Sequence, residues 1–113
     1  MKLLVCGGRN FLNKLFLYNT LDALKLEYDF DSIVHGGAPG ADFLAGKWAQ
    51  DRNIPYKVYK ADWAKYGLSA GPRRNEFMIL DALPDLIVAF PGGKGTEDMK
   101  RRAGHHKIKL IVK

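Results

Sequence analysis

The sequence predicts an α/β fold, a doubly wound sheet of about five mainly parallel strands with helices on both faces. Five apolar runs of strand length alternate with four segments of helix length along the 113 residues. Two of these runs, at residues 2–6 and 85–90, are almost continuously apolar, which is typical of strands buried on both faces. Glycine-rich turns follow three of the runs. Alternation of this kind implies right-handed crossovers, which make neighbouring strands parallel.

The five expected strands occur in order at residues 2–6, 31–35, 55–59, 85–90 and 107–113. The third and fifth runs partly alternate between apolar and polar residues, so we expect them at the edges of the sheet. The N-terminal run is too short for the apolar region of a signal peptide and ends in glycines, so we assign it to the sheet.

The four expected helices occur at residues 14–26, 41–52, 72–83 and 96–104. Pro72 suits the first turn of the third helix, and we expect Thr96 to cap the fourth and Gly104 to end it. The third helix is expected to bury Phe77, Met78, Leu80 and Ala82, and Trp48 of the second helix is expected in the core. Residues 60–71 remain as one long irregular segment, and a loop of that length in a compact domain is usually functional.

Length and composition limit the classes of protein. A chain of 113 residues is expected to form one domain, residues 1–113. Its apolar runs are too short to span a membrane, so no membrane association is expected. Its one cysteine, Cys6, cannot form an internal disulfide, which favours the cytoplasm. The net charge of +6 either serves solvation or attracts an anionic partner. The basic residues concentrate in the last fifth of the chain, beside two histidines: Lys94, Lys100, Arg101, Arg102, Lys107, Lys109, Lys113, His105 and His106.

Three glycine-rich turns are expected to meet at one edge of the sheet, because the carboxyl ends of parallel strands share an edge. Their sequences are CGGRNF, HGGAPGAD and PGGKGTED. Glycines permit a positive φ and a close approach of ligand to backbone, and helix N-termini attract anions. A phosphate-binding nest is therefore predicted, with tight turns as the alternative explanation. Neither GGKGT nor GGAPGA has the spacing of a Walker A loop or of a dinucleotide fingerprint.

The residues predicted to bind a ligand all belong to this edge: Gly7, Gly8, Arg9, Gly36, Gly37, Asp42, Arg74, Asn75, Pro91, Gly92, Gly93, Gly95 and Thr96. Asp42 could equally serve as a helix cap. His35 is interpreted as a structural histidine with its hydrogen bonds satisfied. Trp63 and Tyr66 either stack on a base or pin their segment to the core. The sequence shows no spacing typical of a metal site, and no cofactor is expected.

Four blocks of the sequence resemble the YspA-type, cpYpsA-related branch of the SLOG superfamily: GGRNF, VHGGAPGADFLAGKWA, ADWAKYGLSAGPRRNEFM and AFPGGKGTEDM. Together they cover essentially the whole chain. The resemblance implies a Rossmann-like sheet that binds a nucleotide or an ADP-ribose-like ligand at its glycine-rich edge. It also implies kinship with the LOG phosphoribohydrolases and with DprA-type binders of single-stranded DNA, and assembly into a homodimer or higher homo-oligomer.

The LOG enzymes cleave the N-glycosidic bond of a nucleoside monophosphate, and their signature resembles R-K-x-x-M followed by P-G-G-x-G-T-x-x-E. In this chain Arg74 stands at the functional arginine, Asn75 replaces the lysine, and Met99 occupies the position of the catalytic glutamate. A thioether cannot act as an acid or a base. Asp98, one residue earlier, is the substitute candidate, so Arg74 and Asp98 are the candidate catalytic residues.

Three functions follow from this interpretation. The first is binding of a nucleotide or ADP-ribose-like compound by a sensor, carrier or sequestering protein. The second is N-glycosidic hydrolysis with Arg74 and either Asp98 or Asp42. The third is nucleic-acid binding, which is less favoured because no aromatic residue follows Phe90 in the basic C-terminal part of the chain.

Overall fold

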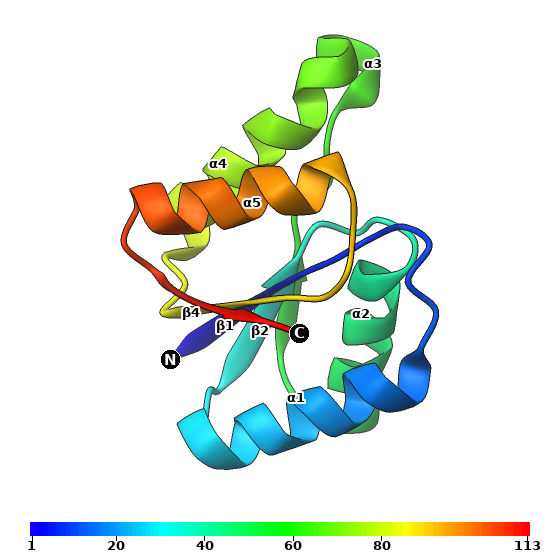
Figure 1. Cartoon of the computed structure of the whole chain (residues 1–113), viewed down its shortest axis with the longest axis vertical. Helices are drawn as coiled ribbons and strands as arrows, with labels where there is room; N and C mark the ends of the chain where they lie inside the picture. The colour runs from blue at the N-terminus through cyan, green and yellow to red at the C-terminus, as the bar shows by residue number, and fades with distance from the viewer.

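The computed structural model describes all 113 residues as one parallel sheet flanked by helices (Figure 1). The elements in chain order are β1 (Lys2–Cys6), α1 (Lys14–Tyr28), β2 (Ser32–His35), α2 (Ala41–Asp51), β3 (Tyr56–Val58), α3 (Trp63–Tyr66), the 3-10 turn η1 (Gly67–Ser69), α4 (Ala70–Ala82), β4 (Leu86–Ala89), α5 (Lys94–His105) and β5 (Lys109–Val112).

The strand order is β3-β2-β1-β4-β5, and every neighbouring pair is parallel. The doubly wound α/β fold predicted from the sequence is therefore confirmed. The two continuous apolar runs form β1 and β4, which lie next to each other inside the sheet and are buried almost throughout. The partly alternating runs form β3 and β5 at the two edges, as expected.

The sheet separates two apolar layers. Figure 1 shows α1 and α2 on one side of the sheet and α4 and α5 on the other. Alternate residues of β1 enter opposite layers, Leu3 and Val5 toward α1 and α2, and Leu4 and Cys6 toward α4 and α5. Trp48 is 1% exposed in the first layer, so its expected place in the core is confirmed. No helix has the length and apolar character needed to cross a membrane.

The segment 60–71 is more regular than expected. Asp62 accepts a hydrogen bond from the backbone N–H of Lys65 (3.1 Å) and thereby caps α3. A 3-10 turn follows, and α4 begins at Ala70, two residues before Pro72. The composition of this segment resembled a loop because its helical turns are too short to carry an apolar period.

The boundaries of α5 also differ from expectation. Gly93 occupies the N-cap position and makes no side-chain capping bond, while Thr96 is buried within the first turn. The helix includes Gly104 and ends one residue later, at His105. Thr96 was therefore wrong as a cap, and its position inside the helix leaves the first turn without a capping side chain.

The apolar face of α4 was only partly predicted. Met78 and Ala82 are buried as expected, and Ile79 is buried with them. Phe77 and Leu80 are 59% and 57% exposed. The helix turns these two side chains away from the sheet, because one face of a helix covers only part of its circumference.

Candidate functional site

A cavity of about 580 Å³ opens at the carboxyl edge of the sheet. It is lined by the turns after β1 and β2, the residues after β3, the first turns of α4 and the first turn of α5. The strands β2 and β3 lie on one side of β1, and β4 and β5 lie on the other. The cavity therefore lies at the point where the strand order reverses. Doubly wound sheets bind their ligands at this point.

The N-terminus of α5 presents free backbone donors to this cavity. The first hydrogen bond of the helix runs from the N–H of Glu97 to the carbonyl of Gly93 (3.0 Å). The N–H groups of the first turn, those of Lys94, Gly95 and Thr96, have no acceptor within the protein. Such groups, together with the helix dipole, favour an anion.

The glycines of this turn leave the approach to the donors open. A Cβ atom built on Gly93 or Gly95 would meet no atom within 4 Å. The φ angle of Gly93 is −103°, so this glycine is not required by a left-handed backbone. No residue of this turn has a positive φ, and open space is the structural property that Gly93 and Gly95 share.

Three basic side chains of the cavity have neither a hydrogen-bond partner nor an ion-pair partner in the protein. Arg9, Lys60 and Lys94 line the cavity and make neither a hydrogen bond nor an ion pair. They come from three different strand ends, those of β1, β3 and β4. Their charges line the same cavity as the free N–H groups of α5, which makes the cavity suited to a phosphate or another anion.

Arg74 is held in place by the backbone of two strand ends. Its Nη1 donates to the carbonyl of Gly36 (2.7 Å) and of Tyr59 (3.2 Å). Burial lowers the pKa of this guanidinium, and the negative charge of Asp42 acts in the opposite direction. Its Nη2 makes no hydrogen bond in the protein, so one end of the fork is left for a ligand.

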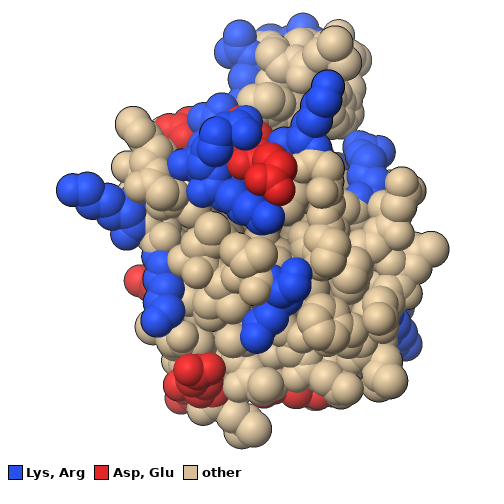
Figure 2. Space-filling model, viewed as in Figure 1, with Lys and Arg blue, Asp and Glu red and all other residues tan.

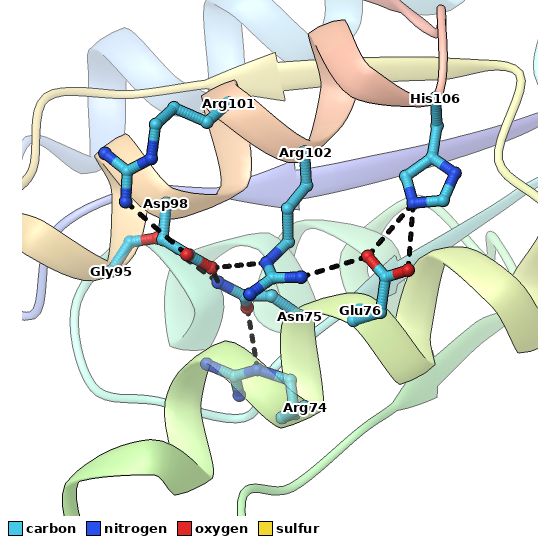
Figure 3. Close-up of polar contacts among 8 residues, drawn as sticks. All are labelled: Arg74, Asn75, Glu76, Gly95, Asp98, Arg101, Arg102 and His106. Atoms are coloured by element: carbon cyan, nitrogen blue, oxygen red, sulfur yellow. Dashed lines mark hydrogen bonds and ion pairs between the residues drawn. The ribbon is translucent and has the colours of Figure 1, made fainter.

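Asn75 connects Arg74 to the first turns of α5 (Figure 3). Its Oδ1 accepts from Nε of Arg74 (3.0 Å), and its Nδ2 donates to the carboxylate of Asp98 (3.0 Å) and the carbonyl of Gly95 (3.3 Å). The residue is 3% exposed. Its polar groups are already engaged, so it positions Arg74 and the turn at Gly95 relative to each other.

Asp42 is the acidic residue that lines the cavity. Its side chain is 5% exposed, and its Oδ2 accepts from the backbone N–H of Ala38 (3.2 Å). Burial raises the pKa of Asp42 to about 6, although the N–H groups of Ala38 and Gly36 and the charge of Arg74 act in the opposite direction. Asp42 therefore gains or loses its proton near pH 6, in a cavity whose other charged residues are all basic.

Asp98 does not line the cavity. Figure 3 shows its carboxylate between Asn75 and Arg102, whose Nε lies 2.8 Å from Oδ2. Burial alone would raise the pKa of Asp98, but the hydrogen bonds from Arg102 and Asn75 outweigh it and lower the pKa. Met99, the next residue, is 0% exposed in the apolar layer beneath α4 and α5. Neither residue presents a carboxylate to the cavity.

Several of the predicted glycines are explained by packing. A Cβ on Gly7 would lie 2.6 Å from Cβ of Ala41, and one on Gly8 would lie 2.9 Å from the carbonyl oxygen of Pro91. The N–H of Gly8 donates to that same oxygen (2.8 Å), so the turns after β1 and β4 are bonded together. Pro91 and Gly92 hold this contact and do not line the cavity.

His35 and Cys6 end their strands beneath the cavity and are not free to react. His35 accepts from the N–H of Gly37 (3.0 Å), but its buried Nε2 has no partner, so the expectation of a fully satisfied histidine is wrong. Burial lowers its pKa to about 4 and keeps the ring neutral. Burial also raises the pKa of the Cys6 thiol to about 12. No group of three or more acidic, histidine or cysteine side chains is arranged to hold a metal ion.

The remaining predicted residues lie in the cavity wall: Arg9, Gly36, Gly37, Asp42, Arg74, Asn75, Gly93, Gly95 and Thr96, together with Gly7 and Gly8. Sequence reasoning did not select Lys60 or Lys94. Lys60 follows the third strand, and the rule that all parallel strands end at one edge would have identified it. Of the two aromatic residues, Trp63 lines the cavity and Tyr66 does not.

Comparison with known proteins found one matching family and a related phage protein. A model of a family described as "YspA, cpYpsA-related SLOG family" matches residues 1–66. A protein named "Gene 61 protein", from Mycobacterium phage D29, is 33% identical over 118 residues, covering 97% of this chain and 94% of that protein.

Proposed function

The chain belongs to the YspA, cpYpsA-related SLOG family, and we propose that it binds a nucleotide or an ADP-ribose-like derivative and leaves that compound intact. Membership of this family is compatible with nucleotide-related binding. In this proposal the phosphate lies at the N-terminus of α5, and the protein acts as a sensor, a carrier or a sequestering module.

The observation that carries the proposal is the convergence of unpaired donors on one cavity. The free N–H groups of the first turn of α5 and the unpaired charges of Arg9, Lys60 and Lys94 surround the same space. Unpaired donors and cations in a concave site are stabilised by an anion that takes their hydrogen bonds. A cavity of about 580 Å³ is within the range of small-molecule sites.

The basic residues of α5 outside the cavity are less suited to a large anionic partner. Figure 2 shows acidic atoms among the basic ones on the face that carries α5. Lys100 pairs with Glu97 (3.1 Å), and Arg102 pairs with both Asp98 (2.8 Å) and Glu76 (3.1 Å). These pairs reduce the net charge available to a nucleic acid, so a small ligand is favoured over a DprA-like activity.

A second candidate function is N-glycosidic hydrolysis with Asp42 as the acid or base. One observation favours it: Asp42 is a carboxyl group in the cavity wall whose raised pKa, about 6, suits proton transfer near neutral pH. Asp98 is less suitable, because its carboxylate is paired with Arg102 and points away from the cavity.

We also propose that the protein forms a homodimer in the cytoplasm. The exposed Phe77 and Leu80 of α4 are available for a partner copy. The free Cys6 fits a reducing compartment. Light scattering at micromolar concentration is expected to give twice the chain mass of 12.7 kDa, and a mass of one chain would contradict the dimer.

The proposed function is tested by titrating the unmodified protein with inorganic phosphate, ribose 5-phosphate, AMP and ADP-ribose in a calorimeter. We expect saturable binding of at least one nucleotide compound, with no adenine released over hours when the mixture is analysed by chromatography. Gly93→Val is the blocking variant, because its side chain would occupy the open space at the free N–H groups.

Gly93→Val is expected to fold and to lose binding. Absence of binding by every phosphate compound would overturn the proposal. Release of adenine that disappears in Asp42→Asn would replace it with the hydrolase.

A further inference from the structure

We infer that Trp63 is the stacking surface for a heteroaromatic base, so that the ligand is a nucleotide retaining its base rather than a free sugar phosphate. This inference rests on the proposed function, because it adds a second subsite to the cavity that holds the phosphate. Trp63 is the first residue of α3, lines the cavity and is 47% exposed. An indole half-exposed in a cavity wall offers a flat apolar surface to a ligand.

The other tryptophan shows how this fold treats an indole that serves packing. Trp48 is 1% exposed, and its Nε1 donates to Asp22 (2.8 Å). The Nε1 of Trp63 has no hydrogen-bond partner in the protein, and nearly half of the residue stays in contact with solvent. Trp63 therefore contributes less to the core than its size allows, and packing alone does not explain its position.

Gly71 allows the indole to lie close to α4. A Cβ atom at Gly71 would lie 3.2 Å from Cη2 and 3.8 Å from Cζ2 of Trp63. The first of these distances is tighter than an ordinary van der Waals contact, so a side chain here would push the ring outward. Gly71 is a buried glycine within a helix, and the space it leaves fixes the outer edge of the indole at the cavity wall.

Arg9 connects this surface to the phosphate end of the cavity. Its guanidinium carbon lies 5.8 Å from the centroid of the Trp63 ring and makes no other polar contact in the protein. A cation–π contact of this kind is weak at an exposed site. Arg9 can therefore leave the Trp63 ring and bind a phosphate while a base stacks on the ring in its place. Alternatively, Arg9 can cover the face of the base that does not contact Trp63.

The cavity thus combines a flat aromatic surface with an anion-binding helix N-terminus, which matches a base joined through a sugar to phosphate. Tyr66 does not share this role, because it lies outside the cavity wall and its ring is next to Arg73 (4.6 Å). Stacking of a base on an aromatic side chain changes affinity by roughly tenfold or more. Ribose 5-phosphate lacks the base and is expected to bind correspondingly more weakly.

The test uses the full chain and follows tryptophan fluorescence and calorimetry with AMP, GMP, CMP, UMP and ribose 5-phosphate. Because Trp48 is enclosed, quenching by a nucleotide reports on Trp63. We expect at least one nucleotide to quench the fluorescence and to bind about tenfold more tightly than ribose 5-phosphate. Trp63→Ala is expected to abolish that preference without changing the affinity for ribose 5-phosphate, and Trp63→Phe is expected to retain most of it. Tyr66→Ala, a matched truncation in the same helix, is expected to change neither affinity.

The possible failures can be told apart. Equal affinities for the nucleotides and for ribose 5-phosphate, or a nucleotide preference that survives Trp63→Ala, would overturn the stacking role alone. An equal loss of both affinities in Trp63→Ala would show that the residue only shapes the cavity, which also overturns the stacking role. Failure of every phosphate compound to bind the unmodified protein would overturn the proposed function, and the inference with it.

Discussion

Two glycine-rich turns that look alike in sequence have different structural roles. The turn after β2, residues 36–40, contains Gly37 and Gly40 with φ angles of 73° and 81°. The turn after β4, residues 91–95, has no residue with a positive φ. Side chains at Gly37 and Gly40 would collide with neighbouring atoms, whereas side chains at Gly93 and Gly95 would meet none. The first turn needs Gly37 and Gly40 in order to fold, whereas Gly93 and Gly95 of the second turn are free to serve a ligand.

The acidic residues that follow the two turns differ in the position of the carboxylate and in the direction of its pKa shift. Asp42, after the first turn, points into the cavity and has a raised pKa. Asp98, after the second, points into a network of hydrogen bonds and has a lowered pKa. A short glycine-rich string followed by an acid therefore predicts neither the backbone conformation nor the direction of the carboxylate.

The largest expected effect is that of Gly40→Ala in the first turn. Its φ of 81° and ψ of −126° suit glycine alone, and a Cβ there would collide with the carbonyl oxygens of Gly8 and Arg9. Backbone strain costs about 1–3 kcal/mol, and the collision adds to it. We expect a loss of more than about 3 kcal/mol in the free energy of unfolding, measured with urea.

Gly67→Ala is the matched control for this prediction. Gly67 also has a positive φ, 57°, but a Cβ there would meet no atom within 4 Å. It is expected to cost only the strain of the backbone, about 1–3 kcal/mol. Equal losses in the two variants would show that the collision at Gly40 is unimportant.

Much of the fold could be predicted, because the patterns that specify it are local. The continuous apolar character of β1 and β4 reflects burial on both faces, and that burial is a property of each strand. The turn residues of α3 and α5 were not predicted correctly. The helical turns of residues 60–71 are too short to carry an apolar period, and the turn before α5 depends on a contact distant in sequence, the bond between Gly8 and Pro91.

The candidate site shows the same division. That Arg9, Asp42 and Arg74 lie at one edge follows from topology alone. The hydrogen bond from Asn75 to Asp98 could not be foreseen, because it depends on how α4 packs against α5, whereas Arg102 lies four residues after Asp98 in the same helix. Free and paired cations look alike in a sequence, so only the structure separates Lys94 from Arg102.

The next prediction concerns Asp42→Asn and the dependence of stability on pH. The pKa of Asp42 in the folded protein, about 6, lies above its ordinary value of 3.8, so protonation of Asp42 favours folding. The stability that Asp42 provides when protonated is fully present below about pH 4 and is lost as the pH rises through 6. The free energy of unfolding falls by as much as about 3 kcal/mol over this range. Asparagine does not ionise, so the variant is not destabilised in this way.

Urea unfolding of both proteins between pH 4 and 8 tests this prediction. The variant is expected to gain stability relative to the unmodified protein as the pH rises and to match it near pH 4. A difference that is constant across this range would mean that the Asp42 carboxyl titrates normally in the folded protein.

Asp98→Asn is expected to show a smaller effect with the opposite dependence on pH. The pKa of Asp98 is lowered in the folded protein, so its contribution is present above the ordinary value of 3.8 and is lost as the pH falls through the folded pKa. Loss of the charge-assisted hydrogen bond from Arg102 is expected to cost about 2 kcal/mol at pH 7. The affinity for AMP is expected to stay within about threefold, because the carboxylate lies outside the cavity. A large loss of affinity with unchanged stability would instead give Asp98 a direct role at the ligand.

The smallest expected effect on stability, and the sharpest test of the second turn, comes from Gly95→Ala. Gly95 lies in the first turn of α5, and a Cβ there would enter open space. Alanine favours helix over glycine by up to about 1 kcal/mol, so thermal unfolding is expected to occur at the same or a slightly higher temperature. Gly104→Ala is the matched control, because Gly104 lies in the last turn of the same helix and a Cβ there also meets no atom within 4 Å. Both variants are expected to keep or gain stability. Only Gly95→Ala is expected to weaken the binding of phosphate compounds, by about tenfold, because Gly95 lies between Lys94 and Thr96, whose N–H groups are free. Equal affinities in the two variants would mean that the open space at Gly95 is not where the anion binds, and the contrast between the two turns would then concern folding alone.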